Sequence, residues 1–177
     1  MLQLEENKIK DISPINTWKC DMLKELNLRK NLISSKIPAL LIPSLEKIDL
    51  SQNKITLIDN MENWKCDNLT FLSLASNKIE DKVPVLKFPK LQTLVLTNNK
   101  LNSIQNIEEW NCDELVTLDL FSNRIGPTLP NLKLPKIRKL DLERNRISDI
   151  SSIKNWDKCN ELVDINLREN IISSPFP

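Results

Sequence analysis

Residues 69–79 read Leu69-Thr70-Phe71-Leu72-Ser73-Leu74-Ala75-Ser76-Asn77-Lys78-Ile79. This frame, Leu-x-x-Leu-x-Leu-x-x-Asn with other aliphatic residues at some leucine positions, returns eight times in the 177-residue chain. The frames end at Asn7, Asn31, Asn53, Asn77, Asn99, Asn123, Asn145 and Asn170, with spacings that alternate between 24 and 22 residues until a last step of 25. A period of this length predicts a solenoid, in which each unit buries its apolar side against its neighbours.

The units are of two kinds. Long units continue as Asn-x-Ile-x-x-Ile-x-x-Ile-x-x-Trp, with Met61 and Leu101 each in one isoleucine position, and then reach a cysteine. Their tryptophans are Trp18, Trp64, Trp110 and Trp156, and their cysteines are Cys20, Cys66, Cys112 and Cys159. Short units carry two prolines instead, as in Pro84 and Pro89. The repeating element is therefore a pair of about 46 residues.

The alternation in each frame is the period of a β-strand, and one short parallel strand per unit would build a continuous concave sheet. On the return path, apolar residues at every third position in the long units predict a 3-10 helix or short α-helix. Two prolines exclude a regular helix in the short units and predict an extended segment. The fold predicted is an α/β solenoid, a right-handed arc whose convex side alternates helical and extended segments.

The chain resembles the leucine-rich repeat superfamily over essentially its whole length. Its long units are similar to the cytosolic repeats of type 1 phosphatase regulators and axonemal dynein light-chain proteins, whereas the short units depart from them. Residues 42–53 also resemble, more weakly, the repeat region of Roco-type kinases. We expect one domain, residues 1–177, of about eight repeats with incomplete repeats at both ends. The repeats start near Met1, Leu23, Leu45, Leu69, Leu91, Leu115, Ile137 and Leu162.

The frame asparagines and the tryptophans are assigned structural roles. An asparagine amide can both donate to and accept from backbone groups that are left unpaired where a strand ends. The assignment covers Asn31, Asn53, Asn77, Asn99, Asn123 and Asn145. Trp18, Trp64, Trp110 and Trp156 could form an aromatic binding stripe, but they fall in the inward column, and we favour core.

Charge and cysteine usage limit the partners. The chain has 25 basic and 24 acidic residues, so it lacks the positive field that nucleic-acid or membrane binding usually needs. Each cysteine recurs once per pair of units, so successive cysteines should lie about 10 Å apart, too far for a disulfide. With no leader recognised at Met1, we expect reduced thiols and a cytoplasmic, nuclear or ciliary protein that is not secreted.

We expect a protein partner on the concave face, as the resemblance implies. The outward positions are charged toward both ends of the array and small or apolar in the middle, which is typical of an interface centre with a charged rim. The candidate binding residues are Phe71, Ser73, Val95, Thr97, Asp119 and Phe121, flanked by Lys47, Asp49, Asp141 and Arg144. The alternative is that two surface phenylalanines in eight strands are accidental.

A basic column follows the asparagines, formed by Lys54, Lys78, Lys100, Arg124 and Arg146, with Lys8 before them. Such an edge could hold an acidic partner. Lysine and arginine are common at this position of the repeat, so a solvated edge is the favoured interpretation.

No catalytic, metal or cofactor site is expected. The chain has no histidine and one glycine, Gly126, which cannot by itself form a phosphate-binding loop. Three functional readings remain: a non-catalytic adaptor or scaffold, the repeat segment of a larger signalling protein such as a Roco-like kinase, and a regulatory subunit of a phosphatase or axonemal motor. Neither end carries a polar capping unit, so we expect end-to-end self-association or covering by flanking repeats.

Overall fold

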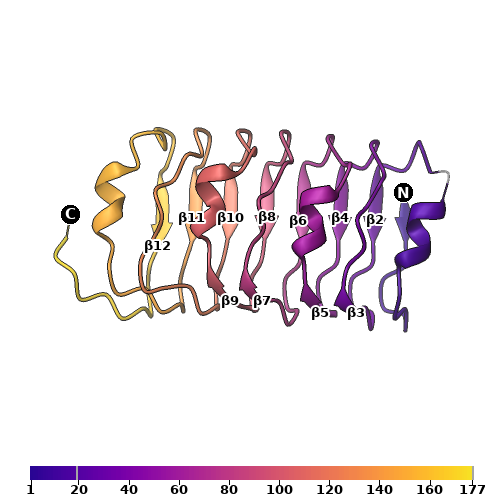
Figure 1. Ribbon diagram of the computed structural model, residues 1–177, viewed down its shortest axis with the longest axis horizontal. Coiled ribbons are helices and arrows are strands. Elements are labelled where there is room, and N and C mark those ends of the chain that lie inside the picture. The colour runs from indigo at the N-terminus through magenta and orange to yellow at the C-terminus, as the bar shows by residue number, and fades with distance from the viewer. Residues whose placement is uncertain (19, 177) are drawn as a thin grey trace.

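The computed structural model describes residues 1–18 and 20–176. In these residues the units stand side by side along one axis, with the two termini at opposite ends (Figure 1). Each unit contributes one strand to an eight-stranded parallel sheet. In spatial order the strands are β1 (Leu2–Gln3), β2 (Glu25–Asn27), β4 (Lys47–Asp49), β6 (Phe71–Ser73), β8 (Thr93–Val95), β10 (Thr117–Asp119), β11 (Lys139–Asp141) and β12 (Asp164–Asn166).

The return segments alternate as predicted. Each long unit forms a five-residue 3-10 helix, namely η1 (Ser13–Thr17), η2 (Asp59–Asn63), η3 (Gln105–Glu109) and η4 (Ser151–Asn155). Short units run extended and pair with the next long unit in two small sheets, β3 (Ser34–Lys36) with β5 (Lys54–Leu57) and β7 (Glu80–Lys82) with β9 (Lys100–Ser103). The architecture confirms the predicted leucine-rich-repeat-like solenoid. No helix in the described ranges is long and apolar enough to cross a bilayer.

The core lies between the sheet and the return segments. The middle residue of each internal strand, for example Leu72 in β6 or Leu94 in β8, is completely buried. Because side chains alternate along a strand, its neighbours on either side face the opposite, concave surface. Removing such a leucine from water contributes about 2 kcal/mol. The equivalent middle residue of the last strand, Ile165 in β12, is less covered and is 36% exposed.

The asparagine ladder connects each unit to the next. The Asn77 amide nitrogen donates to the carbonyls of Leu50, Leu74 and Ala75, and its oxygen accepts from the backbone N–H of Ile55. The other internal frame asparagines are buried and repeat this pattern of three donated bonds and one accepted bond. The structure thus places the asparagines where backbone groups would otherwise lack partners.

Trp18 departs from the core position expected of all four tryptophans. Trp64, Trp110 and Trp156 are buried, and the indole N–H groups of Trp64 and Trp156 each donate over 3.0 Å to a proline carbonyl of the preceding short unit, Pro38 and Pro130 respectively. Trp18 is 41% exposed, because no short unit in the structure packs against η1. The burial of these tryptophans therefore depends on the neighbouring unit.

Every frame asparagine is preceded by a residue in the left-handed conformation. These residues are Glu6, Lys30, Gln52, Ser76, Asn98, Ser122, Arg144 and Glu169, with φ between 53° and 56°. The conformation costs a residue with a Cβ about 1–2 kcal/mol, whereas glycine adopts it freely.

Replacing Gln52 by glycine should therefore raise the free energy of unfolding by about 0.5–1 kcal/mol, measured by chemical denaturation. Gln92 is a matched control, because it is also exposed and does not have a positive φ. The Gln92→Gly substitution should lower stability by a similar amount, through the added freedom of the unfolded chain. Equal losses in both variants would contradict the prediction.

Gly126 marks an irregular third short unit. In the first two short units the left-handed residues are Ser35 and Asp81, and each lies at a bulge in the small sheet. The equivalent residue of the third unit is Pro127, whose ring fixes φ near −65° and excludes that conformation. Gly126 takes a positive φ of 157° instead, and an isolated bridge between Thr128 and Asp149 replaces the small sheet.

Candidate functional site

The outward side chains of the sheet form three parallel rows. The first row holds the first residue of each three-residue strand, so that Phe71 lies between Lys47 and Thr93. The second row holds the third residue, so that Val95 lies between Ser73 and Asp119. The third row follows two residues later and holds Ala75, Thr97, Phe121, Glu143 and Arg168 among others.

Six outward residues define a central neutral zone. They are Phe71, Ser73 and Ala75 from the β6 repeat and Thr93, Val95 and Thr97 from the β8 repeat. Ser73 is only 5% exposed and offers little surface, whereas Phe71, Val95 and Thr97 are half-buried. The hydroxyl oxygen of Thr97 is buried and has no hydrogen-bond partner among the described residues. The zone has no charged side chain.

A small hollow adjoins this zone on the N-terminal side. It has a volume of about 160 Å³ and is bordered by Phe71, Lys47, Asp49 and the outward residues of β1 and β2. Lys47 is paired with Glu25 over 3.2 Å, so its charge is already compensated. Phe71 therefore forms one wall of a recess whose other walls are polar.

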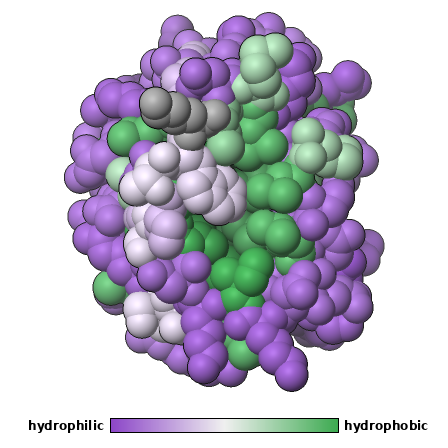
Figure 2. Space-filling model, turned by 90° about the vertical axis from the view of Figure 1, so that its right-hand side faces the viewer, coloured by the Kyte–Doolittle hydropathy of each residue, from purple (hydrophilic) through white to green (hydrophobic). Residues whose placement is uncertain are grey.

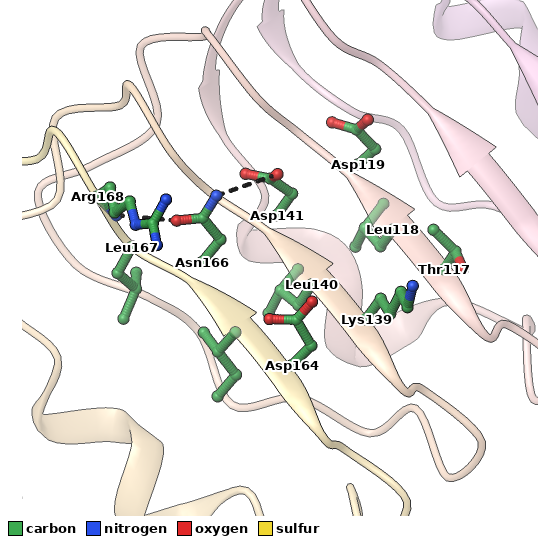
Figure 3. Close-up of a pocket in the computed structure, with 11 residues that line it drawn as sticks. Thr117, Leu118, Asp119, Lys139, Leu140, Asp141, Asp164, Asn166, Leu167 and Arg168 are labelled. Carbon is green, nitrogen blue, oxygen red and sulfur yellow. Dashed lines mark hydrogen bonds between the residues drawn. The ribbon is translucent and has the colours of Figure 1, made fainter.

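A larger hollow of about 530 Å³ lies over β10, β11 and β12. Figure 3 shows Asp119, Asp141 and Asn166 along its middle, with Lys139 and Asp164 nearer the strand starts and Arg168 at the turn. The Asn166 amide donates to Asp141 over 3.3 Å and to Glu143 over 2.7 Å. Lys139, Asp164, Asn166 and Arg168 were not among the binding residues predicted from the sequence, because the hollow forms between the side chains of three adjacent repeats.

Phe121 is packed differently from Phe71. The guanidinium carbon of Arg144 lies 5.5 Å from the centre of the Phe121 ring, within the range of a cation–π contact. Arg144 is held in turn by two bonds to Glu169, of 2.7 and 3.2 Å. Phe121 also belongs to a repeat two strands away from Phe71, which separates the two residues by about 10 Å across the sheet. It lies four positions later in its frame, which adds about 13 Å along the strand direction. The structure thus does not bring the two phenylalanines into one patch.

Three predicted aspartates have a local structural role. One carboxylate oxygen of Asp49, Asp119 and Asp141 accepts the backbone N–H two residues later, over 2.8, 3.0 and 2.9 Å respectively. These bonds pair N–H groups where the strands end. The second oxygen of Asp141 accepts from the Asn166 amide. All three aspartates lie in the second outward row, so they also contribute charge to the concave surface.

The predicted basic edge has regular backbone bonding but is partly neutralised by an ion pair. The backbone N–H groups of its five residues each donate to the preceding unit, as Lys78 does to Ile55 over 2.9 Å. Lys100 is paired with Glu80 over 2.6 Å, and the pKa of Glu80 is lowered mainly by this hydrogen bond and further by the charges of Lys100 and Arg124. Lys54, Lys78, Arg124 and Arg146 make no ion pair within the described ranges. Glu80 interrupts the edge at its centre.

The cysteines are free thiols packed in the return segments. Burial raises the pKa of Cys66 and of Cys112 to about 11, and it also raises the pKa of Cys159. At neutral pH these three thiols are protonated and poorly nucleophilic. Across the part of the chain that is described, no group of three or more Cys, Asp or Glu side chains is placed to hold a metal ion.

Comparison with known proteins agrees with this geometry. Models of leucine-rich repeats match residues 44–64, and in two-repeat form residues 67–109 and 113–155. No curated protein sequence matches significantly. Among solved structures, a plant peptide hormone receptor, RGFR1 in complex with RGF2, is 21% identical with a TM-score of 0.61 over 86% of this chain. Internalin C2 from Listeria monocytogenes is 23% identical with a TM-score of 0.58 over 90% of it.

Another Listeria monocytogenes internalin, InlF, is 16% identical with a TM-score of 0.55 over 95% of this chain. The chain spans 29% of the receptor, 54% of InlF and 76% of internalin C2. At these identities the structural likeness concerns the fold alone. Together the repeat models cover more than half of the residues, with the frame asparagines Asn53, Asn77, Asn99, Asn123 and Asn145 inside them. The chain therefore belongs to the leucine-rich repeat family.

Proposed function

We propose that this chain is a non-catalytic protein-interaction module that binds a partner on the concave sheet, at the central neutral zone. Leucine-rich repeat proteins in general mediate protein–protein interaction. The proposal rests on the change from charged to uncharged side chains along the outward rows of the sheet. Charged residues occupy them in β4, β10 and β11, whereas β6 and β8 present Phe71, Thr93 and Val95.

This arrangement suits a partner segment that is uncharged at its centre. Burying a charged side chain without a partner is costly, whereas Phe71 and Val95 gain free energy when they are covered. The aspartates on either side would then orient the partner through their outer carboxylate oxygens.

Phe71 is the principal anchor in this proposal, and Phe121 has a supporting role. Phe71 lines an open recess, whereas Phe121 already packs against Arg144. Asp119, Asp141 and Arg144 form the C-terminal rim, and Lys47 and Asp49 form the N-terminal rim. The proposal concerns the face itself, and it would apply equally to a free adaptor, a repeat segment of a signalling protein or a regulatory subunit.

The test is selection of binding peptides from a random display library on the wild-type protein. We expect the Phe71→Ser/Val95→Ser variant to bind the selected peptides at least about 30-fold more weakly, since loss of a central aromatic contact costs 2 kcal/mol or more. Leu57→Ser is the matched control, because Leu57 is 46% exposed but lies in β5, outside the concave sheet. Peptides that bind both variants as tightly as the wild type would contradict the proposal.

We further propose a reducing compartment, such as the cytoplasm. Support comes from the four free cysteines, of which Cys66 and Cys112 are completely buried. Free thiols of this kind are typical of intracellular proteins. Recovery of the endogenous protein with all four thiols unmodified would agree with this location, and a disulfide or N-glycan on the purified protein would contradict it.

A further inference from the structure

The two long edges of the solenoid differ in charge. Viewed from the first unit, hydrophilic residues lie on both sides of a central hydrophobic stripe (Figure 2). The edge before the strands mixes the two signs and compensates them in ion pairs, such as Lys24 with Glu46 and Lys136 with Glu114. The edge after the strands is the basic edge, formed by Lys54, Lys78, Lys100, Arg124 and Arg146. The basic edge therefore repeats one sign over consecutive units.

The basic edge is a regular row of side chains. Each of its residues follows a frame asparagine, and its backbone N–H donates to the preceding unit over 2.8 or 2.9 Å. Because neighbouring parallel strands are about 4.8 Å apart, the row is about 19 Å long. Uncharged residues precede the asparagines in its first four units, namely Gln52, Ser76, Asn98 and Ser122. These neighbours leave the positive charge of the row uncompensated on that side.

Glu80 shows that this row can bind a carboxylate. Its carboxylate lies 2.6 Å from the ammonium group of Lys100, at the middle of the row. The pKa of Glu80 is lowered mainly by this hydrogen bond, and the charges of Lys100 and Arg124 lower it further. Asp81 follows in β7 and adds a second negative charge near the centre. The centre of the basic edge is therefore neutralised within the chain itself.

Two pairs of cations remain on either side of this centre. Lys54 and Lys78 precede it, and Arg124 and Arg146 follow it. All four side chains belong to exposed residues, and none is in an ion pair among residues 1–18 and 20–176. Within each pair the residues come from adjacent strands of the sheet, about 4.8 Å apart. Each pair can therefore attract a cluster of negative charge.

The distance between the two pairs fits an extended segment. Their centres are three strand spacings apart, which is about 14 Å. An extended chain advances about 3.4 Å per residue, so about four residues cover this distance. A segment that lies along the row passes Glu80 at its middle, where a further carboxylate would be repelled. The row thus favours negative charge at two places and disfavours it between them.

We propose that the basic edge binds an extended acidic segment of a protein partner, with two acidic clusters about four residues apart and an uncharged centre. One cluster pairs with Lys54 and Lys78. The other pairs with Arg124 and Arg146, whose guanidinium groups can each form two parallel bonds to a carboxylate. This surface lies on the edge of the sheet, outside the central neutral zone, so it does not depend on the function proposed for the concave face.

The first test is an NMR titration of the isotope-labelled protein with the peptide Glu-Glu-Gly-Ser-Glu-Glu, blocked at both ends, at about 20 mM salt where screening is weak. We expect the backbone amide shifts to map to the basic edge. Arg124→Gln/Arg146→Gln should weaken binding about tenfold, because two exposed ion pairs are lost. Lys65→Gln/Lys87→Gln is the matched control and should stay within about twofold, since it removes the same charge from exposed residues outside this edge. Shifts that do not map to the basic edge overturn the proposal.

A second peptide tests the uncharged centre. Gly-Glu-Glu-Glu-Glu-Ser has the same composition, but its acidic residues meet Glu80, so the wild type should bind it about threefold more weakly or worse. Glu80→Gln should abolish this difference, and the fold should be retained because Glu80 is exposed. Equal affinity of the wild type for both peptides contradicts the two-cluster arrangement. An oligothymidylate of the same charge that binds this edge more tightly than either peptide would indicate a nucleic-acid site and would also overturn the proposal.

Discussion

Replacing Asn77 with alanine is expected to lower the free energy of unfolding by about 3–4 kcal/mol. The substitution removes three donated bonds and leaves the buried N–H of Ile55 without an acceptor. Each lost bond contributes about 1 kcal/mol, and an unpaired buried donor costs about 1–3 kcal/mol. The Leu50, Leu74 and Ala75 carbonyls retain other donors, which limits the loss. Urea denaturation followed by circular dichroism measures the change.

Asn7 provides the matched control for Asn77. It occupies the same position of the frame, but it is exposed and bonds only to carbonyls of its own unit. Asn7→Ala should therefore cost less than about 1 kcal/mol. If both variants lose the same small amount, the ladder does not hold the units together in the way described. A shallower transition for Asn77→Ala would indicate that the solenoid unfolds in two segments.

Gly126→Ala is expected to destabilise the protein by more than about 3 kcal/mol. A Cβ at this position would overlap the carbonyl group of Arg146, and the φ of 157° is strained for any residue with a side chain. The Arg146 N–H donates to the Ile125 carbonyl over 2.8 Å, so the backbone at Arg146 cannot move away without breaking this hydrogen bond between units. Thermal and urea unfolding of the purified variant measure the loss.

Pro127→Asp should rescue much of this loss. With proline removed, position 127 can adopt the left-handed conformation that Asp81 has in the second short unit, and position 126 no longer needs a glycine. Gly126→Ala/Pro127→Asp should regain more than half of the lost stability, and Pro127→Asp alone should change it by less than about 1 kcal/mol. A double variant no more stable than Gly126→Ala would show that the irregular turn has another cause.

The concave face illustrates why the sequence could predict only part of the proposed site. The frame identified the outward positions, so the neutral character of β6 and β8 could be predicted. It could not show that Ser73 is covered, or that Phe121 is already occupied by Arg144, because both depend on side chains of adjacent strands. The hollow over β10 to β12 was missed for the same reason. The sites themselves remain predictions until a partner is tested.

The sequence alone determined the period, the parallel sheet, the alternation of return segments and the buried asparagine ladder. These features follow from local patterns that repeat in every unit, and the repetition averages out the ambiguity of any single segment. Only the tertiary structure decided which equivalent positions differ. Trp18 is exposed whereas Trp64 is buried, and Gly126 has a positive φ whereas Glu80, at the same position of its unit, does not. The physical reason is that a side chain's burial and hydrogen bonding in a solenoid depend on the units before and after it, which the repeat pattern itself does not specify.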